Sequence, residues 1–129
     1  MEDLYFEATN KTPKVSFRAA DGKLEIIGRS IPENSYKFYE PVLQWLDEYI
    51  DSPAEKTELT FKLDYFNTSS SMYILGILKK LEFLHEKGHA VQVKWYYDVE
   101  DEDMMQTGED LKQIVKLPIE ILEIDQEEA

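Results

Sequence analysis

Segments with the alternating pattern of β-strands take turns along this sequence with segments that carry apolar residues at helical spacing. Residues 57–66 alternate polar and apolar side chains. The following stretch, 72–87, places Ile74, Leu78 and Leu81 on one helical face. A strand, a helix and a second strand in succession need a crossover connection, so this alternation predicts strands that pair at least partly in parallel.

The N-terminal third adds a different motif. Residues 15–18 and 23–28 alternate on either side of the Asp21-Gly22 dipeptide, which predicts a β-hairpin, and residues 4–8 supply a candidate edge strand. The remaining elements are expected in this order: a helix whose apolar positions run from 38 to 50 and which stops near 51–53, a strand over 57–66, a helix over 72–87 closed by Gly88, a strand over 89–97, a helix around 108–116 with Leu111, Ile114 and Val115 inward, and a strand over 117–124. Pro41 is expected either to kink the first of these helices or to mark where its regular part begins. Residues 125–129 are expected to form a fraying acidic tail. The whole pattern predicts one α/β domain over 1–129, with an N-terminal hairpin and a mixed sheet on which the helices pack.

Size and charge restrict the classes of partner. The 129 residues suffice for one core, and the absence of cysteine excludes disulfides and thiolate metal sites. Asp and Glu total 27 against 14 Lys and Arg, a net charge of −13 that disfavours nucleic acid and anionic lipid surfaces. No apolar run has the length of a membrane span, and the acidic N-terminus lacks the pattern of a signal peptide. We therefore expect a cytoplasmic protein that neither enters a membrane nor binds nucleic acid.

The turn between the strand 57–66 and the next helix is the most informative segment. It reads Asn67-Thr68-Ser69-Ser70-Ser71, so consecutive hydroxyl groups stand where a helix begins. The first backbone N–H groups of a helix have no internal partner, and they favour a phosphate placed there. The same hydroxyl groups are also common helix caps. The residues alone leave both roles open, and they do not decide whether Ser69 or Ser70 would share a modification.

A second polar connector precedes the first helix. Glu33, Asn34 and Ser35 follow Pro32 and are suited to cap that helix. Both connectors lie between a strand and a helix, so they are expected on the same rim of the fold. We assign Pro32, Glu33, Asn34 and Ser35, together with Tyr65, to a candidate partner-binding surface.

Three separated motifs give the chain a family resemblance. They are residues 32–36 (PENSY), 65–70 (YFNTSS) and 95–98 (WYYD), and they occur in this order along the chain. The turn at 67–71 resembles the phosphorylatable turn of STAS-type anti-sigma-factor antagonists, and the three motifs together resemble the SiaC family of bacterial regulatory phosphoproteins. The resemblance implies a STAS-like fold in which Thr68 is phosphorylated by a serine/threonine kinase and dephosphorylated by a PP2C-like phosphatase. It also implies that the unphosphorylated form binds and activates a diguanylate cyclase, in cyclic-di-GMP and biofilm control.

Two segments partly match the motifs of metal sites in enzymes and calcium-binding proteins. Residues 85–89 spell the H-E-x-x-H pattern of zinc proteases, but Gly88 is expected to end the helix before His89, so the two rings would not converge on one metal. The acidic run 98–103 lacks the spacing of a calcium loop and is expected to be a solvated run ahead of a helix. We therefore expect no catalytic residues, metal or cofactor.

Three hypotheses remain distinguishable by experiment. The first is a phosphorylation-controlled partner protein, in which Asn67, Ser69 and Ser70 shape the turn around Thr68. The second is a constitutive adaptor in which that turn is only a helix cap, so that Thr68→Ala would cost about 1 kcal/mol of stability. The third is a zinc hydrolase that uses His85, Glu86 and His89.

Overall fold

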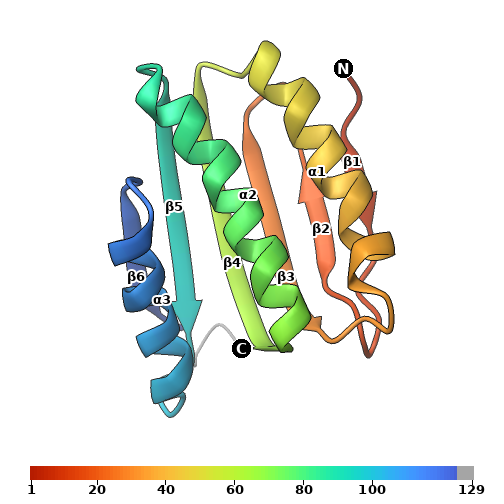
Figure 1. The fold of residues 1–129 in the computed structure, drawn as a ribbon, viewed down its shortest axis with the longest axis vertical. Helices are drawn as coiled ribbons and strands as arrows, with labels where there is room; N and C mark the ends of the chain where they lie inside the picture. The colour runs from red at the N-terminus through yellow and green to blue at the C-terminus, as the bar shows by residue number, and fades with distance from the viewer. Residues whose placement is uncertain (125–129) are drawn as a thin grey trace.

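The hairpin and the strand–helix alternation form one mixed sheet (Figure 1). The structure is a computed structural model that describes residues 1–124; the predicted tail at 125–129 lies outside the described residues. Its elements are β1 (Leu4–Phe6), β2 (Lys14–Phe17), β3 (Lys23–Ser30), α1 (Ser35–Asp51), β4 (Lys56–Phe66), α2 (Thr68–Glu86), β5 (Ala90–Tyr97), α3 (Glu102–Ile114) and β6 (Ile119–Glu123). Among residues 1–124, no helix is long and apolar enough to cross a membrane.

The six strands lie in the sheet in the order in which they occur along the chain. β1, β2 and β3 pair antiparallel, whereas β3, β4, β5 and β6 pair parallel. The hairpin and the partly parallel pairing are therefore confirmed. The hairpin turn depends on Gly22, whose φ of +69° is in the left-handed region that favours glycine.

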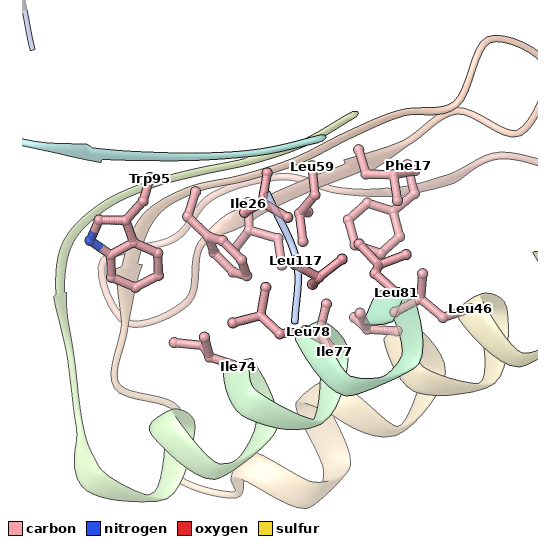
Figure 2. Close-up of a cluster of buried hydrophobic side chains, with 14 of the residues drawn as sticks. Phe17, Ile26, Leu46, Leu59, Ile74, Ile77, Leu78, Leu81, Trp95 and Leu117 are labelled. Atoms are coloured by element: carbon pink, nitrogen blue, oxygen red, sulfur yellow. The ribbon is translucent and has the colours of Figure 1, made fainter. Parts of the chain in front are cut away.

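The core lies between the sheet and the helices (Figure 2). Alternate strand residues such as Ile26, Leu59 and Trp95 point toward the helices and are buried. From α2, Ile74, Ile77, Leu78 and Leu81 meet them, and all four are at most 1% exposed. Trp95 also donates a hydrogen bond to the Met104 carbonyl of α3 at 2.9 Å. All three helices therefore cover the same face of the sheet, as expected.

The helices α1 and α2 run parallel and in register. Contacts follow one another along their length at a nearly constant offset: Ser35 with Ser69, Tyr39 with Tyr73, and Asp47 with Lys80. Both helices return the chain between parallel strands, which gives them a common direction. Their N-terminal ends consequently lie side by side at the edge where β3 and β4 end (Figure 1).

Two helices begin earlier than predicted, whereas α1 begins where its predicted cap places it. α1 starts at Ser35, directly after the cap residue Asn34, so Pro41 lies inside the helix and does not mark where its regular part begins. α2 begins at Thr68, four residues before the predicted start. α3 spans Glu102–Ile114 instead of 108–116, because Asp101 caps it and acidic residues stabilise its first turn. In addition, Ile114 was predicted to face inward but is 55% exposed.

Candidate functional site

The turn that contains Thr68 lies between the end of β4 and the start of α2. Only Asn67 separates the two elements, and its backbone N–H donates to the Ser30 carbonyl at the end of β3 (3.0 Å). The parallel strands therefore hold the start of α2 rigidly at their common carboxyl edge. Thr68 is the first helical residue, where the positive end of the helix dipole is strongest.

The cap of α2 is Asn67. Its backbone is extended, and its side-chain Oδ1 accepts a hydrogen bond from the Ser70 backbone N–H at 2.9 Å and one from the Ser69 hydroxyl at 3.2 Å. Asparagine is among the most favourable N-cap residues because its short side chain reaches the free N–H groups of the first turn. The turn does cap the helix, but Thr68 itself is not the cap, which corrects the expectation attached to the adaptor hypothesis.

The consecutive hydroxyl groups have different environments. Ser70 is fully buried, shares a hydrogen bond with the Ser30 hydroxyl at 2.8 Å and donates to the Ser30 carbonyl at 3.1 Å. Ser69 shares a hydrogen bond of 2.6 Å with the Ser35 hydroxyl, and the Ser71 hydroxyl donates to the Thr68 carbonyl. The Thr68 side chain is exposed and makes no hydrogen bond within residues 1–124. Of these four groups, Thr68 is the one whose hydroxyl is open to solvent and unengaged.

A buried hydroxyl cluster joins the two helix starts beneath Thr68. The Tyr39 hydroxyl lies 2.6 Å from the Ser30 hydroxyl, which in turn contacts Ser70. Burial raises the pKa of Tyr39, while its hydrogen bonds to Ser30 and Ser70 act in the opposite direction. The raised pKa keeps the phenol protonated. Since the Tyr39 ring also stacks on Tyr73 at 5.2 Å, the first turns of α1 and α2 form one rigid unit.

The predicted partner surface is only partly exposed. Asn34 caps α1 by accepting from the Lys37 N–H at 3.0 Å, and Glu33 is exposed and pairs with Lys11 at 3.0 Å. Pro32 and Ser35 are buried, however, so they support the turn and are not exposed contacts. Their burial follows from the close approach of the two helix starts, in which Ser35 bonds to Ser69.

Exposed apolar side chains occur on both sides of Thr68 in the sequence and at the start of α1. Tyr65 is 57% exposed, and Met72, one helical turn after Thr68 on the same face of α2, is 73% exposed. Tyr36, in the first turn of α1, is 60% exposed. We call the exposed residues at this edge the rim: Glu33, Asn34, Tyr36, Tyr65, Thr68 and Met72. Tyr36 and Met72 were not among the predicted site residues, although the spacing of four residues between Thr68 and Met72 indicates that the two share a helix face.

The two histidines of the H-E-x-x-H pattern do not share a helix. His85 lies in the last turn of α2, and Gly88 ends the helix with a φ of +95° while its N–H donates to the His85 carbonyl at 2.9 Å. His89 follows this break, just before β5. This is the geometry expected from the position of Gly88, and it removes the convergence of rings that the zinc-protease motif needs.

Comparison with known proteins identifies the family. A family model described as "SiaC family regulatory phosphoprotein" matches residues 6–124. The chain belongs to the SiaC family. An uncharacterized protein of Pseudomonas aeruginosa (strain UCBPP-PA14) is 32% identical to this SiaC-family chain over 121 residues, which cover 94% of this chain and 96% of the relative.

Solved structures extend the similarity to the fold. The activator SiaC from Pseudomonas aeruginosa, in a crystal structure of its complex with the diguanylate cyclase SiaD, matches this SiaC-family chain with a TM-score of 0.90 and 31% identity. The match covers 95% of this chain and 100% of that one. The apo form of SiaC from Pseudomonas aeruginosa matches with a TM-score of 0.87 and 31% identity, over 95% of this chain and 99% of that one. The α/β fold predicted from the sequence is thus that of SiaC.

Proposed function

We propose that this protein is a non-enzymatic cytoplasmic signalling protein that is switched by reversible phosphorylation of Thr68. In this proposal a serine/threonine kinase and a PP2C-like phosphatase set the state of Thr68. The unphosphorylated form binds a diguanylate cyclase through the rim and activates it, which links the protein to cyclic-di-GMP signalling and biofilm control. No metal or cofactor takes part.

The observation that carries the proposal is the difference among the hydroxyl groups of the turn. Thr68 is exposed and unengaged, whereas Ser69 and Ser70 are held by Ser35 and Ser30. A kinase must place the attacking hydroxyl in line with a phosphate, which requires access from solvent. This argument favours Thr68 as the acceptor and disfavours Ser70, which would have to leave the core.

The position of Thr68 suits a switch that leaves the fold intact. A phosphate there meets the positive end of the α2 dipole, so it is compatible with the folded helix. The same dianion would stand one helical turn from the exposed Met72 side chain, on the same face of α2. An interface built around a neutral hydroxyl and apolar neighbours would then bury charge without compensation, and binding would be lost.

The proposed partner follows from family membership. SiaC from Pseudomonas aeruginosa is described as the activator of the diguanylate cyclase SiaD and forms a complex with it. The similarity covers nearly all of both chains, which supports a partner of the same class for this protein. Tyrosine and exposed methionine, which the rim offers, are common anchors of protein interfaces.

The decisive experiment compares Thr68→Ala and Thr68→Glu for binding to the cognate diguanylate cyclase. Thr68→Ala should bind and activate the cyclase like the unphosphorylated protein, and Thr68→Glu should lose binding by at least about tenfold, which corresponds to about 1.4 kcal/mol. Gln113→Glu, which adds the same charge at an exposed position on α3, is the matched control and should bind normally. Equal binding by the two Thr68 variants would contradict the proposal.

The constitutive-adaptor alternative retains one supporting observation, the capping role of the turn through Asn67. Phosphosite mass spectrometry on the protein from its native cells separates the two functions. Occupancy of Thr68 that changes between two growth states supports the switch. A Thr68 that is never modified, together with normal cyclase binding, would establish the adaptor instead.

A further inference from the structure

The outer face of the two long helices carries a groove that the core does not use. It is about 530 Å³ in volume and lies between α1 and α2, on the side away from the sheet. Its apolar lining comes from Leu43 and Ile50 on α1 and from Gly76 and Phe83 on α2. Gly76 has no side chain to occupy the groove. A Cβ built at this position would meet only Leu43 Cδ2, at 4.0 Å.

A protruding aromatic ring stands beside this groove. Phe83 is 49% exposed, and the Lys87 ammonium lies 4.4 Å from the centre of its ring. The ring continues the apolar lining formed by Leu43 and Ile50, so the apolar surface here is contiguous and not a single exposed side chain. The molecule thus presents an apolar knob and an apolar hollow next to each other.

The two walls of the groove have opposite charge. α1 contributes Asp47 and Asp51, and α2 contributes Lys79 and Lys80. Lys80 pairs with Asp47 across the groove within the same chain. Lys79 is half-exposed and has only a 3.5 Å contact with Glu82, while Asp51 is exposed and forms no ion pair within residues 1–124. Each chain therefore offers one incompletely neutralised cation and one free anion on opposite walls.

We propose that this groove is the interface between two copies of the chain, related by a two-fold axis that runs along the groove. Such an axis is parallel to the helices, so it places α1 of one copy over α2 of the other. It leaves the position of every residue along the helix direction, here called its height, unchanged. The in-register contacts of Tyr39 with Tyr73 and of Asp47 with Lys80 fix those heights. Phe83 of each copy then faces Ile50 of the other, and each Lys79 faces the acidic wall formed by Asp47 and Asp51.

Charge selects this axis over the alternative. A two-fold axis across the helices would set the acidic wall of α1 against itself and the lysines of α2 against each other, which is repulsive. The axis along the groove instead brings acidic and basic walls together twice. Self-complementarity of both shape and charge is the requirement for an isologous interface.

The interface is small, so the dimer is expected to be weak and reversible. Helices of 17 and 19 residues are about 25–28 Å long, and a face two helices wide is below the area of a standard stable interface. The net charge of −13 opposes association as well. The inference does not depend on phosphorylation of Thr68, which does not line the groove.

The test is sedimentation equilibrium of the full chain, from about 1 μM to about 1 mM at moderate salt. The average mass of the native protein should rise toward twice the 15.2 kDa chain mass. Phe83→Ser should stay at the chain mass throughout. Ile114→Ser, which removes an equally exposed apolar side chain from α3, should associate like the native protein. A native protein that remains at 15.2 kDa, or a Phe83→Ser protein that associates normally, would overturn the proposal.

Cross-linking tests the orientation, because the chain has no natural cysteine. Lys79→Cys mixed with Asp47→Cys, which lies at nearly the same height along the helices, should give a mixed disulfide dimer at least severalfold faster than either variant mixed with Ile114→Cys. Faster linking of Lys79→Cys to itself would overturn the arrangement along the groove.

Discussion

At the scale of single residues, the neighbouring polar side chains from Asn67 to Ser70 have different structural roles. Asn67 caps a helix, Ser69 and Ser70 join it to the adjoining elements, and Thr68 is left exposed. The sequence predicts the turn and its position after a strand, because both follow from residue type and pattern. It does not separate the roles of the four hydroxyl groups, because those depend on Ser30 and Ser35, which are distant in sequence and contact the turn only after folding.

Replacement of Asn67 by alanine should therefore reduce stability, whereas replacement of Thr68 by alanine should not. Asn67→Ala removes the acceptor for the Ser70 N–H and should lower the free energy of unfolding by about 1 kcal/mol. Thr68→Ala should change it by less than about 0.5 kcal/mol, since exposed positions without partners tolerate substitution. Urea unfolding followed by circular dichroism measures both values. A loss at Thr68 as large as that at Asn67 would show that Thr68 takes part in capping.

At the scale of elements, the prediction is best where apolar periodicity is strong and poorest at α3. The acidic run before Met104 was expected to be a solvated approach to a helix, but part of it forms the first turn. Asp101 caps this turn by accepting from the Met104 N–H at 3.0 Å, and carboxylates favour the positive end of the dipole. The sequence pattern predicts a helix that starts around Gly108. The structure places it inside α3, directly against the Trp95 ring.

The closeness of Gly108 to Trp95 has a measurable consequence. A Cβ at position 108 would lie 2.5 Å from Trp95 Cδ1 and 2.9 Å from Ile121 Cδ1, so Gly108→Ala forces these core side chains to move. We expect a loss of about 1–2 kcal/mol after the gain in helix propensity, together with a shift in tryptophan fluorescence.

Gly76→Ala is the matched control, because its Cβ would meet only Leu43 at 4.0 Å. This variant should stabilise α2 by about 0.5–1 kcal/mol. Thermal unfolding of both variants measures the two changes in stability. If Gly108→Ala were stabilised like Gly76→Ala, α3 would not pack closely on Trp95.

At the scale of the whole molecule, the helices cover one face of the sheet and leave the other to solvent (Figure 1). Charged side chains alternate with the core residues along the strands and face this open side, where Glu58 on β4 and Lys94 on β5 form an ion pair at 2.6 Å. The hairpin, the partly parallel pairing and the one-sided helix layer all follow from the periodicities and crossover rules. The resemblance to STAS-type proteins remains a prediction.

This ion pair should make stability depend on pH in a definite direction. The hydrogen bond to Lys94 lowers the pKa of Glu58, and the hydrogen bond to Glu58 raises the pKa of Lys94. The contribution of Glu58 is present above the ordinary carboxyl pKa and is lost as the pH falls through the lowered pKa. The contribution of Lys94 is present below the ordinary lysine pKa and is lost as the pH rises through the raised one.

Glu58→Gln should therefore be less stable than the native protein by about 0.5 kcal/mol at pH 7, and the difference should vanish at an acid pH below the lowered pKa of Glu58. Glu55→Gln removes an exposed carboxylate that forms no ion pair in residues 1–124 and should match the native protein at both values. Urea titrations at the two pH values test this, and a difference that persists in acid would assign the effect of the substitution to packing.

The sequential order of the six strands has a consequence for how the protein is made. Every strand pairs with the strand that precedes it in the chain, so each one finds its partner already synthesised when it leaves the ribosome. The loops that must close during folding are short, extending no further than one crossover helix. Co-translational folding can therefore add one strand at a time to the growing edge of the sheet, and no later segment has to be inserted between two that have already paired.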